Sequence, residues 1–179
     1  MTSGDAVKIW ICLLRAVNVG GTGKLPMAEL RRMCEEIGFE QVRTYIASGN
    51  VVCRSGHEEA GVKAALEEAL AGYAGKPVGV MVRSPKDMAA VLAGNPFAEA
   101  PGNRCVTIFL DEAPPSDALD DLRGRKDERV ALGRREIYVH YGDGMADSKL
   151  RIPAAANGTA RNMNTVAKLV AMAREAAGD

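Results

Sequence analysis

The chain has 179 residues, of which 47% are apolar and 4% aromatic, and its 23 basic residues balance 23 acidic ones. This length supports one large domain or two small lobes with an aliphatic core. The zero net charge argues against a general nucleic-acid coat, and no apolar run is long enough to cross a membrane. Because residues 1–8 carry an acid and no basic segment, we expect no signal peptide and a cytoplasmic location.

The first half of the chain alternates between strand and helix patterns. Residues 7–15 are apolar on both alternations, which is typical of a strand covered on both faces. Pro26 begins a helix with one apolar stripe, and Gly38 ends it. Two short strands around a Ser-Gly-Asn turn, a second helix and a fourth strand follow, at residues 42–54, 58–73 and 78–83.

This order, βαββαβ, predicts a ferredoxin-like lobe in which both helices cover one face of a four-stranded sheet. We expect the opposite face to carry Trp10, Cys12, Leu14 and Met81. So large an apolar surface rarely stays exposed. The second half of the chain, or a partner subunit, would then cover it.

The second half has a weaker pattern. Ser84 caps a third helix that runs to about Ala93, and residues 94–103 form a turn-rich linker. A strand, a short helix, a hairpin and a last helix are expected next, at residues 104–110, 114–122, 128–141 and about 161–176. The prediction is an α+β fold with a ferredoxin-like lobe, a helix with a linker, and a second, partial βαββα lobe packed on the first, at residues 1–83, 84–103 and 104–179.

The glycine-rich loop at residues 18–25 has the position of a phosphate-binding P-loop, between a strand and a helix. Asn18 occupies the first glycine position and Leu25 replaces the hydroxyl that would bind magnesium, so the loop does not match an NTPase. Backbone N–H groups at Gly20 and Gly21, together with Lys24, would still suit an anion near a helix N-terminus. A flexible turn with a solvated lysine explains the same residues.

Residues 157–169 crowd polar side chains at the predicted start of the last helix. One or two would cap that helix, whereas Arg161 is poorly placed against the positive end of the helix dipole. A bound anion would offset this cost, and so would a carboxylate of the protein itself. The sequence leaves both explanations open.

Cysteine and histidine give no sign of a metal centre. The four cysteines form no CxxC pair, and His57 and His140 stand alone. We therefore expect no metal site and no cofactor, and we expect the cysteines to be small buried residues.

Three segments, at residues 13–21, 43–52 and 159–169, read LLRAVNVGG, RTYIASGNVV and TARNMNTVAKL. They resemble a bacterial family of small uncharacterised proteins, catalogued as a domain of unknown function, whose motifs read LLRGxNVGG, RTYxxSGNVxF and TxRNWNT. The resemblance implies a ferredoxin-like α+β fold, a cytoplasmic location and no established activity. Ala16 and Met163 stand where the family usually has glycine and tryptophan. If that tryptophan stacks on a ligand, stacking is weakened here, and if it packs in the core, methionine fills the gap.

The candidate ligand-binding residues come from these segments and the loop beside them: Arg15, Asn18, Gly20, Gly21, Lys24, Ser48, Asn50, Arg161, Asn162 and Asn164. They offer amides, hydroxyls and cations but no group suited to act as a general base. This favours binding of a small anionic or phosphorylated ligand over catalysis. A structural or protein-interaction module without a ligand and a metal-independent enzyme of unknown class stay open, and neither catalytic residues nor the oligomeric state can be read from the chain. Nucleic-acid binding on the sheet is disfavoured, because the third strand has no aromatic residue and the first has only Trp10.

Overall fold

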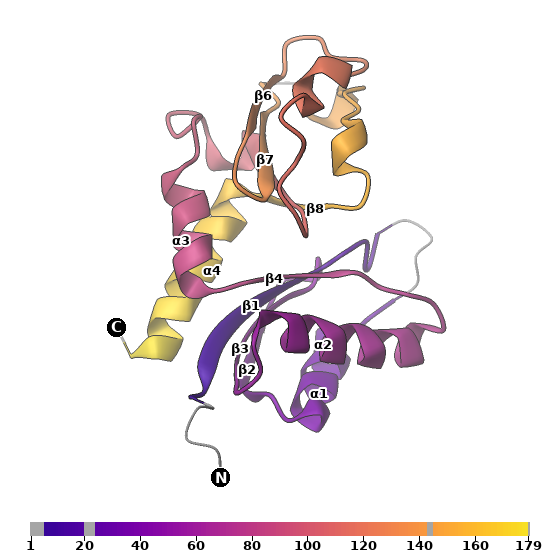
Figure 1. Cartoon of the computed structure of the whole chain (residues 1–179), viewed down its shortest axis with the longest axis vertical. Helices are drawn as coiled ribbons and strands as arrows, with labels where there is room; N and C mark the ends of the chain where they lie inside the picture. Colours follow the sequence, from indigo (N-terminus) through magenta and orange to yellow (C-terminus); the bar gives the residue numbers. More distant parts are fainter. Residues whose placement is uncertain (1–5, 20–23, 143–144, 179) are drawn as a thin grey trace. The chain divides into compact units, whose positions relative to one another are not determined.

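A computed structural model describes residues 6–19, 24–142 and 145–178 of the chain. Residue contacts divide these into two compact units. The first unit contains the described residues up to Met88 and those from Leu169 onward, and the second runs from Ala89 to Lys168. Figure 1 shows the elements of each unit. Each sheet lies within one of the two expected lobes, whereas the C-terminal residues group with the first unit.

The first unit has the expected βαββαβ order. Its strands form an antiparallel sheet in the order β2-β3-β1-β4, which is the ferredoxin-like arrangement. Gly38 ends α1 with a φ of 106°, and the following Phe39 N–H donates to Cys34 O at 3.0 Å, as in a Schellman cap. The bounds of the elements are β1 Lys8–Leu14, α1 Met27–Ile37, β2 Glu40–Tyr45, β3 Asn50–Ser55, α2 Glu59–Ala74 and β4 Val80–Arg83.

The side chains of β1 alternate between two buried faces. Trp10, Cys12 and Leu14 pack into one core with the buried side chains of α1 and α2. The expectation that these three lie on the face away from the helices is therefore wrong. Met81 does lie on that other face, because it pairs with Leu13 across β1 and β4. Since β1 is apolar on both alternations, its sequence carries no signal for which face the helices cover.

The second face of this sheet is buried as well, with Ile11, Leu13 and Val52 each 0% exposed. The C-terminal half of α4 (Met163–Ala177) belongs to this unit. Its Glu175 accepts a hydrogen bond at 2.8 Å from Nη1 of Arg43, which pairs with Val52 on this face. The end of the chain thus returns to the second face of the first sheet.

The second unit repeats the strand order of the first. Its antiparallel sheet runs β6-β7-β5-β8, so β5 and β7 are central as β1 and β3 are. In place of the helices it has short 3-10 turns: the segment expected to start a short helix forms only η2 (Ala118–Asp121). Helix α3 (Pro85–Ala93) contains the boundary between the two units, after Met88. The other elements are η1 Gly102–Arg104, β5 Cys105–Phe109, β6 Arg129–Leu132, β7 Glu136–His140, η3 Met145–Asp147, η4 Pro153–Ala155 and β8 Thr159–Asn162.

The fourth strand, β8, corrects the expectation that the last helix begins at about Arg161. Residues Thr159–Asn162 pair antiparallel with β5, and α4 begins only at Met163. Their burial alternates with period two, since Thr159 and Arg161 are buried while Ala160 is exposed. A crowded polar segment hides this alternation, because the buried positions hold a threonine and an arginine instead of apolar residues. The second sheet is therefore complete, and not the partial one that was expected.

Candidate functional site

The first two motif segments meet at one end of the first sheet. Antiparallel pairing sets Leu13 of β1 opposite Asn50, where β3 starts. The Leu14 N–H donates to Gly49 O at 2.9 Å. The loop that leaves β1 and the β2–β3 turn consequently lie side by side, because the end of one antiparallel strand adjoins the start of its neighbour.

Asn18 holds these two loops together through its side chain. Its Nδ2 donates to Leu25 O and to Ala47 O, both at 2.8 Å, and its Oδ1 accepts from Leu25 N–H at 2.6 Å. The first bond and the last connect Asn18 to Leu25, and the second bond attaches Asn18 to the β2–β3 turn. With both amide hydrogens and the oxygen engaged inside the protein, Asn18 positions the loop.

Asn50 and Gly49 shape the turn itself. Asn50 is 0% exposed, and its Nδ2 donates to Tyr45 O at 2.8 Å and to Ser48 Oγ at 3.0 Å. Gly49 has a φ of +89°, and a Cβ there would lie 2.8 Å from Val17 Cγ2. Only glycine allows the turn to approach Val17 so closely. The motif thus fixes where Val17 lies.

A cavity of about 290 Å³ opens beside these loops. It contains two cations, Lys24 and Lys76, and no described residue that lines it is acidic. Val17, which Gly49 contacts, and Leu25, which Asn18 binds, are both among its lining residues. The described lining residues are Ala16, Val17, Lys24, Leu25, Leu70, Tyr73, Ala74, Lys76 and Val78. Ala16 and Val17 of the first motif segment form part of its wall, and the other described lining residues, including both cations, lie outside the three motif segments.

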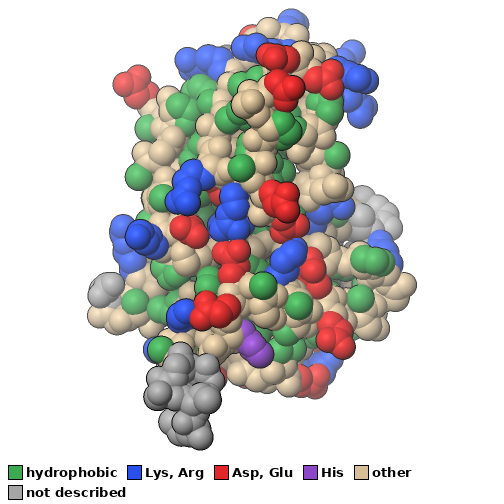
Figure 2. Space-filling view, viewed as in Figure 1, with side chains coloured by type: hydrophobic (Ala, Val, Ile, Leu, Met, Phe, Trp, Pro, Cys, Tyr) green, Lys and Arg blue, Asp and Glu red, His purple; other side chains and the backbone are tan. Residues whose placement is uncertain are grey.

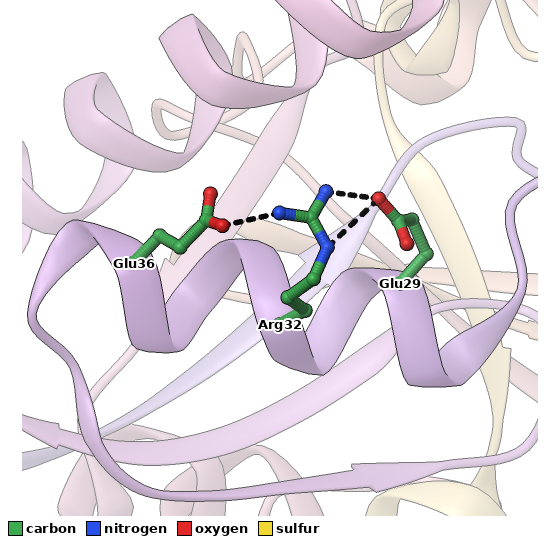
Figure 3. Close-up of polar contacts among 3 residues, drawn as sticks. All are labelled: Glu29, Arg32 and Glu36. Carbon is green, nitrogen blue, oxygen red and sulfur yellow. Dashed lines mark hydrogen bonds and ion pairs between the residues drawn. The ribbon is translucent and has the colours of Figure 1, made fainter.

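Tyr73 also borders a shallower groove between α1 and α2, lined by Arg32, Glu36 and Ile37 among others. Figure 3 shows the Arg32 guanidinium held between Glu29 and Glu36 on α1. The hydrogen bond from Arg32 lowers the pKa of the Glu29 carboxyl. Because two carboxylates already neutralise Arg32, this groove offers an anion much less than the cavity does.

The other expected residues near this end differ in what they do. Arg15 is exposed, and its backbone N–H donates to Gly79 O at 2.8 Å at the entry to β4. Ser48 accepts the hydrogen bond from Asn50. Gly20 and Gly21 lie outside the described residues. Of the expected residues that are described, Lys24 lines the cavity.

The third motif segment belongs to the second unit, at the junction of β8 and α4. Arg161 is only 6% exposed, and its Nη1 donates to Thr159 Oγ1 at 2.8 Å and to Ala160 O at 2.9 Å. Burial lowers the pKa of its guanidinium to about 10. The placement of Arg161 in the first turn of the last helix, from which the helix-dipole argument for an anion started, is therefore wrong, since Arg161 lies on β8 and α4 begins at Met163.

Its neighbours also have roles within the second unit. Asn162 is the N-cap of α4, with its Oδ1 accepting from Thr165 N–H at 2.9 Å. Asn164 is exposed and lies against Gly102, where an added Cβ would come within 2.1 Å of its Oδ1. Met163 is buried and accepts a hydrogen bond from Thr107 Oγ1 at 3.0 Å. A packing role for this position, one of the two alternatives raised by the resemblance, fits this burial.

Sequence reasoning missed Lys76 and Tyr73. Both lie around the end of α2, where Gly75 caps the helix with a φ of 71°. The Gly-Lys-Pro order predicts a helix end but not that the lysine faces a cavity. Only the return of β4 alongside β1 brings residues 73–78 next to Ala16, Val17, Lys24 and Leu25.

The cysteines and the surface complete the chemical description. All four cysteines are free and buried, as expected, and burial raises the pKa of the Cys34 thiol to about 12. Within the described ranges, His, Cys, Asp and Glu form no group of three that could hold a metal ion. No helix of the described residues is long and apolar enough to cross a membrane. On the face shown in Figure 2, basic and acidic side chains are interspersed.

Comparison with known proteins gives a family and a fold. The model of a family described as protein of unknown function (DUF1697) matches residues 7–138. Among solved structures, a conserved bacterial protein, SP0830 from Streptococcus pneumoniae, aligns with a TM-score of 0.78 and 28% identity. The alignment covers 94% of this chain and 99% of the other. The search of curated proteins gave no match.

Proposed function

Because the chain belongs to the DUF1697 family of proteins of unknown function, its activity has to be argued from its own residues, and we propose that it binds a small anionic ligand through Lys24 and Lys76. The observation that carries this proposal is the cavity beside the first two motif segments, which has two lysines and no acidic residue among its described lining residues. A phosphate or carboxylate placed there would meet two ammonium groups over a partly buried floor.

The arrangement of the motif residues supports the same function. The two loops that border the cavity are held by the side-chain hydrogen bonds of Asn18 and Asn50 and by the close packing at Gly49. A wall fixed in this way holds its side chains in place before a ligand arrives, which reduces the entropy lost on binding. Because we have identified no general base among the described residues that line the cavity, we propose binding and do not propose a reaction.

Thermal unfolding in the presence of anions tests the proposal. We expect inorganic phosphate, pyrophosphate or ethyl phosphate to raise the melting temperature, since a ligand at 100 times its Kd stabilises the folded state by about 2.7 kcal/mol. Lys24→Met and Lys76→Met remove one cation each and keep the aliphatic stem. Each variant should weaken binding about fivefold, because an exposed ion pair contributes roughly 1 kcal/mol and this free energy corresponds to about a fivefold change in Kd.

Lys86→Met is the matched control, because Lys86 is an exposed lysine of the same unit that does not line the cavity. It should leave anion binding unchanged, and added salt should weaken binding to the unmodified protein. If the Lys86 variant loses as much affinity as the cavity variants, binding is non-specific and the proposal fails. If no anion raises the melting temperature at millimolar concentration, the motifs serve the structure alone.

A further inference from the structure

The lining of the cavity also favours one kind of chemical group attached to the anion. The described side chains of its lining are apolar apart from the two lysines and the hydroxyl of Tyr73. Leu25 and Leu70 are buried, at 6% and 1% exposed, and form the floor, and the half-buried Val78 lies beside them. Such a surface gains free energy by covering alkyl or aryl carbon, at about 25 cal/mol per Å² of apolar area.

The same lining is poorly suited to a sugar or a nucleoside. Each hydroxyl of a sugar that leaves water needs a hydrogen-bonding partner, and a hydroxyl left without one opposes binding. The described lining contains no Asp, Asn, Ser or Thr side chain that could supply such a partner. Among the described side chains, a polyhydroxylated anion would therefore find few partners for its hydroxyls.

The size of the cavity limits the apolar body. A volume of about 290 Å³ lies just below the range of about 300–1,000 Å³ that is typical of small-molecule sites. It suits a small ligand such as a phosphate monoester with a chain of about six carbons. A dinucleotide or a long-chain lipid would extend beyond it.

We propose that the ligand is a short amphiphilic anion, with its phosphate or carboxylate between Lys24 and Lys76 and an apolar body of about six carbons on Leu25, Leu70 and Val78. This inference rests on the proposed function and adds the class of ligand. The cations would set where the ligand binds, and the apolar floor would set which anion is preferred.

A matched series of phosphates tests the apolar body by isothermal titration. Ethyl, butyl and hexyl phosphate should bind progressively tighter, by about fourfold for each methylene buried, which is about 0.8 kcal/mol converted at tenfold per 1.4 kcal/mol. Glucose 6-phosphate, with the same charged group and six carbons, should bind no tighter than ethyl phosphate. Equal affinities for ethyl and hexyl phosphate would overturn the inference and leave the proposed function standing.

Two further experiments test the apolar body and the charged group of the ligand separately. Val78→Thr keeps the shape of the side chain and replaces a methyl group with a hydroxyl, so it should weaken the binding of hexyl phosphate more than that of ethyl phosphate. Hexan-1-ol, which lacks the charge, should bind at least tenfold more weakly than hexyl phosphate. If the alcohol binds as tightly, the lysines do not recognise an anion, and the inference and the proposed function both fail. If none of the phosphates binds, it is the proposed function that has failed.

Discussion

An alanine at position 49 tests whether the β2–β3 turn fixes the wall of the cavity. Gly49 has a φ of +89°, and an added Cβ would lie 2.8 Å from Val17 Cγ2 and 2.9 Å from Leu14 Cβ. A left-handed backbone costs an L-residue about 1–2 kcal/mol, and overpacking a core site costs about 1–3 kcal/mol more. We expect Gly49→Ala to lower the free energy of unfolding by roughly 2–5 kcal/mol, a large part of the 5–15 kcal/mol typical of a domain.

Two other glycines separate these contributions in urea unfolding experiments. Gly38 has a φ of 106° and nothing within 4 Å of an added Cβ, so Gly38→Ala should cost only the backbone term of about 1–2 kcal/mol. Gly72 lies within α2 with free space around it, so Gly72→Ala should stabilise by about 0.5–1 kcal/mol. If Gly49→Ala costs no more than Gly38→Ala, the contact with Val17 yields easily and the turn does not fix the wall.

Three further predictions concern other residues. Ala16 has a φ of 55°, so Ala16→Gly should raise the free energy of unfolding in urea by about 0.5–1 kcal/mol; a loss would show that the alanine methyl group packs favourably. Hydrogen bonds from the Ser148 hydroxyl and the Lys126 N–H lower the pKa of the Glu128 carboxyl to about 2. Because this folded-state pKa lies below the ordinary 4.5, ionised Glu128 stabilises the folded protein above pH 4.5, and this stabilisation is lost as the pH falls toward 2. Ser148→Ala removes one of these hydrogen bonds. The variant should therefore show a smaller drop in melting temperature than the unmodified protein between pH 4.5 and 2. Arg161→Ala removes hydrogen bonds to Thr159 and Ala160 and should destabilise the ligand-free protein by about 1–3 kcal/mol, whereas the exposed Arg134→Ala should change it little; equal unfolding curves for both variants would contradict a structural role for Arg161.

Local patterns predict most of the first sheet. The apolar runs of β1 and β4, the stripe of α1 and the glycine at its end are features of consecutive residues, and they gave the βαββαβ order that the structure has. The face that β1 turns toward the helices could not be predicted, because Trp10 and Cys12 on one side are no more apolar than Ile11 and Leu13 on the other.

The candidate site depends on contacts that no local pattern contains. Lys24 and Lys76 are about fifty residues apart, and they line one cavity because β4 pairs with β1. The strand at residues 159–162 was not predicted, for a different reason. Its strand buries Arg161, a residue type that is almost never buried without partners, so its alternation gave no apolar signal and the polar side chains suggested a helix cap instead.

The motif residues of the first unit hold two loops in an unusual backbone conformation. These residues form the frame of the site, whereas the lysines that would bind the anion lie outside the motifs. Of the four described residues with positive φ that are not glycine, Ala16, Asn18 and Ile46 lie in the two adjoining loops, and Gln41 lies in β2. Each such conformation costs on the order of 1 kcal/mol, and the three hydrogen bonds of the Asn18 side chain help to offset the total. The lysines take no part in these bonds, so a change at Lys76 would weaken the proposed anion binding without altering them. Relatives that keep the same motif residues can therefore share this frame while binding different ligands.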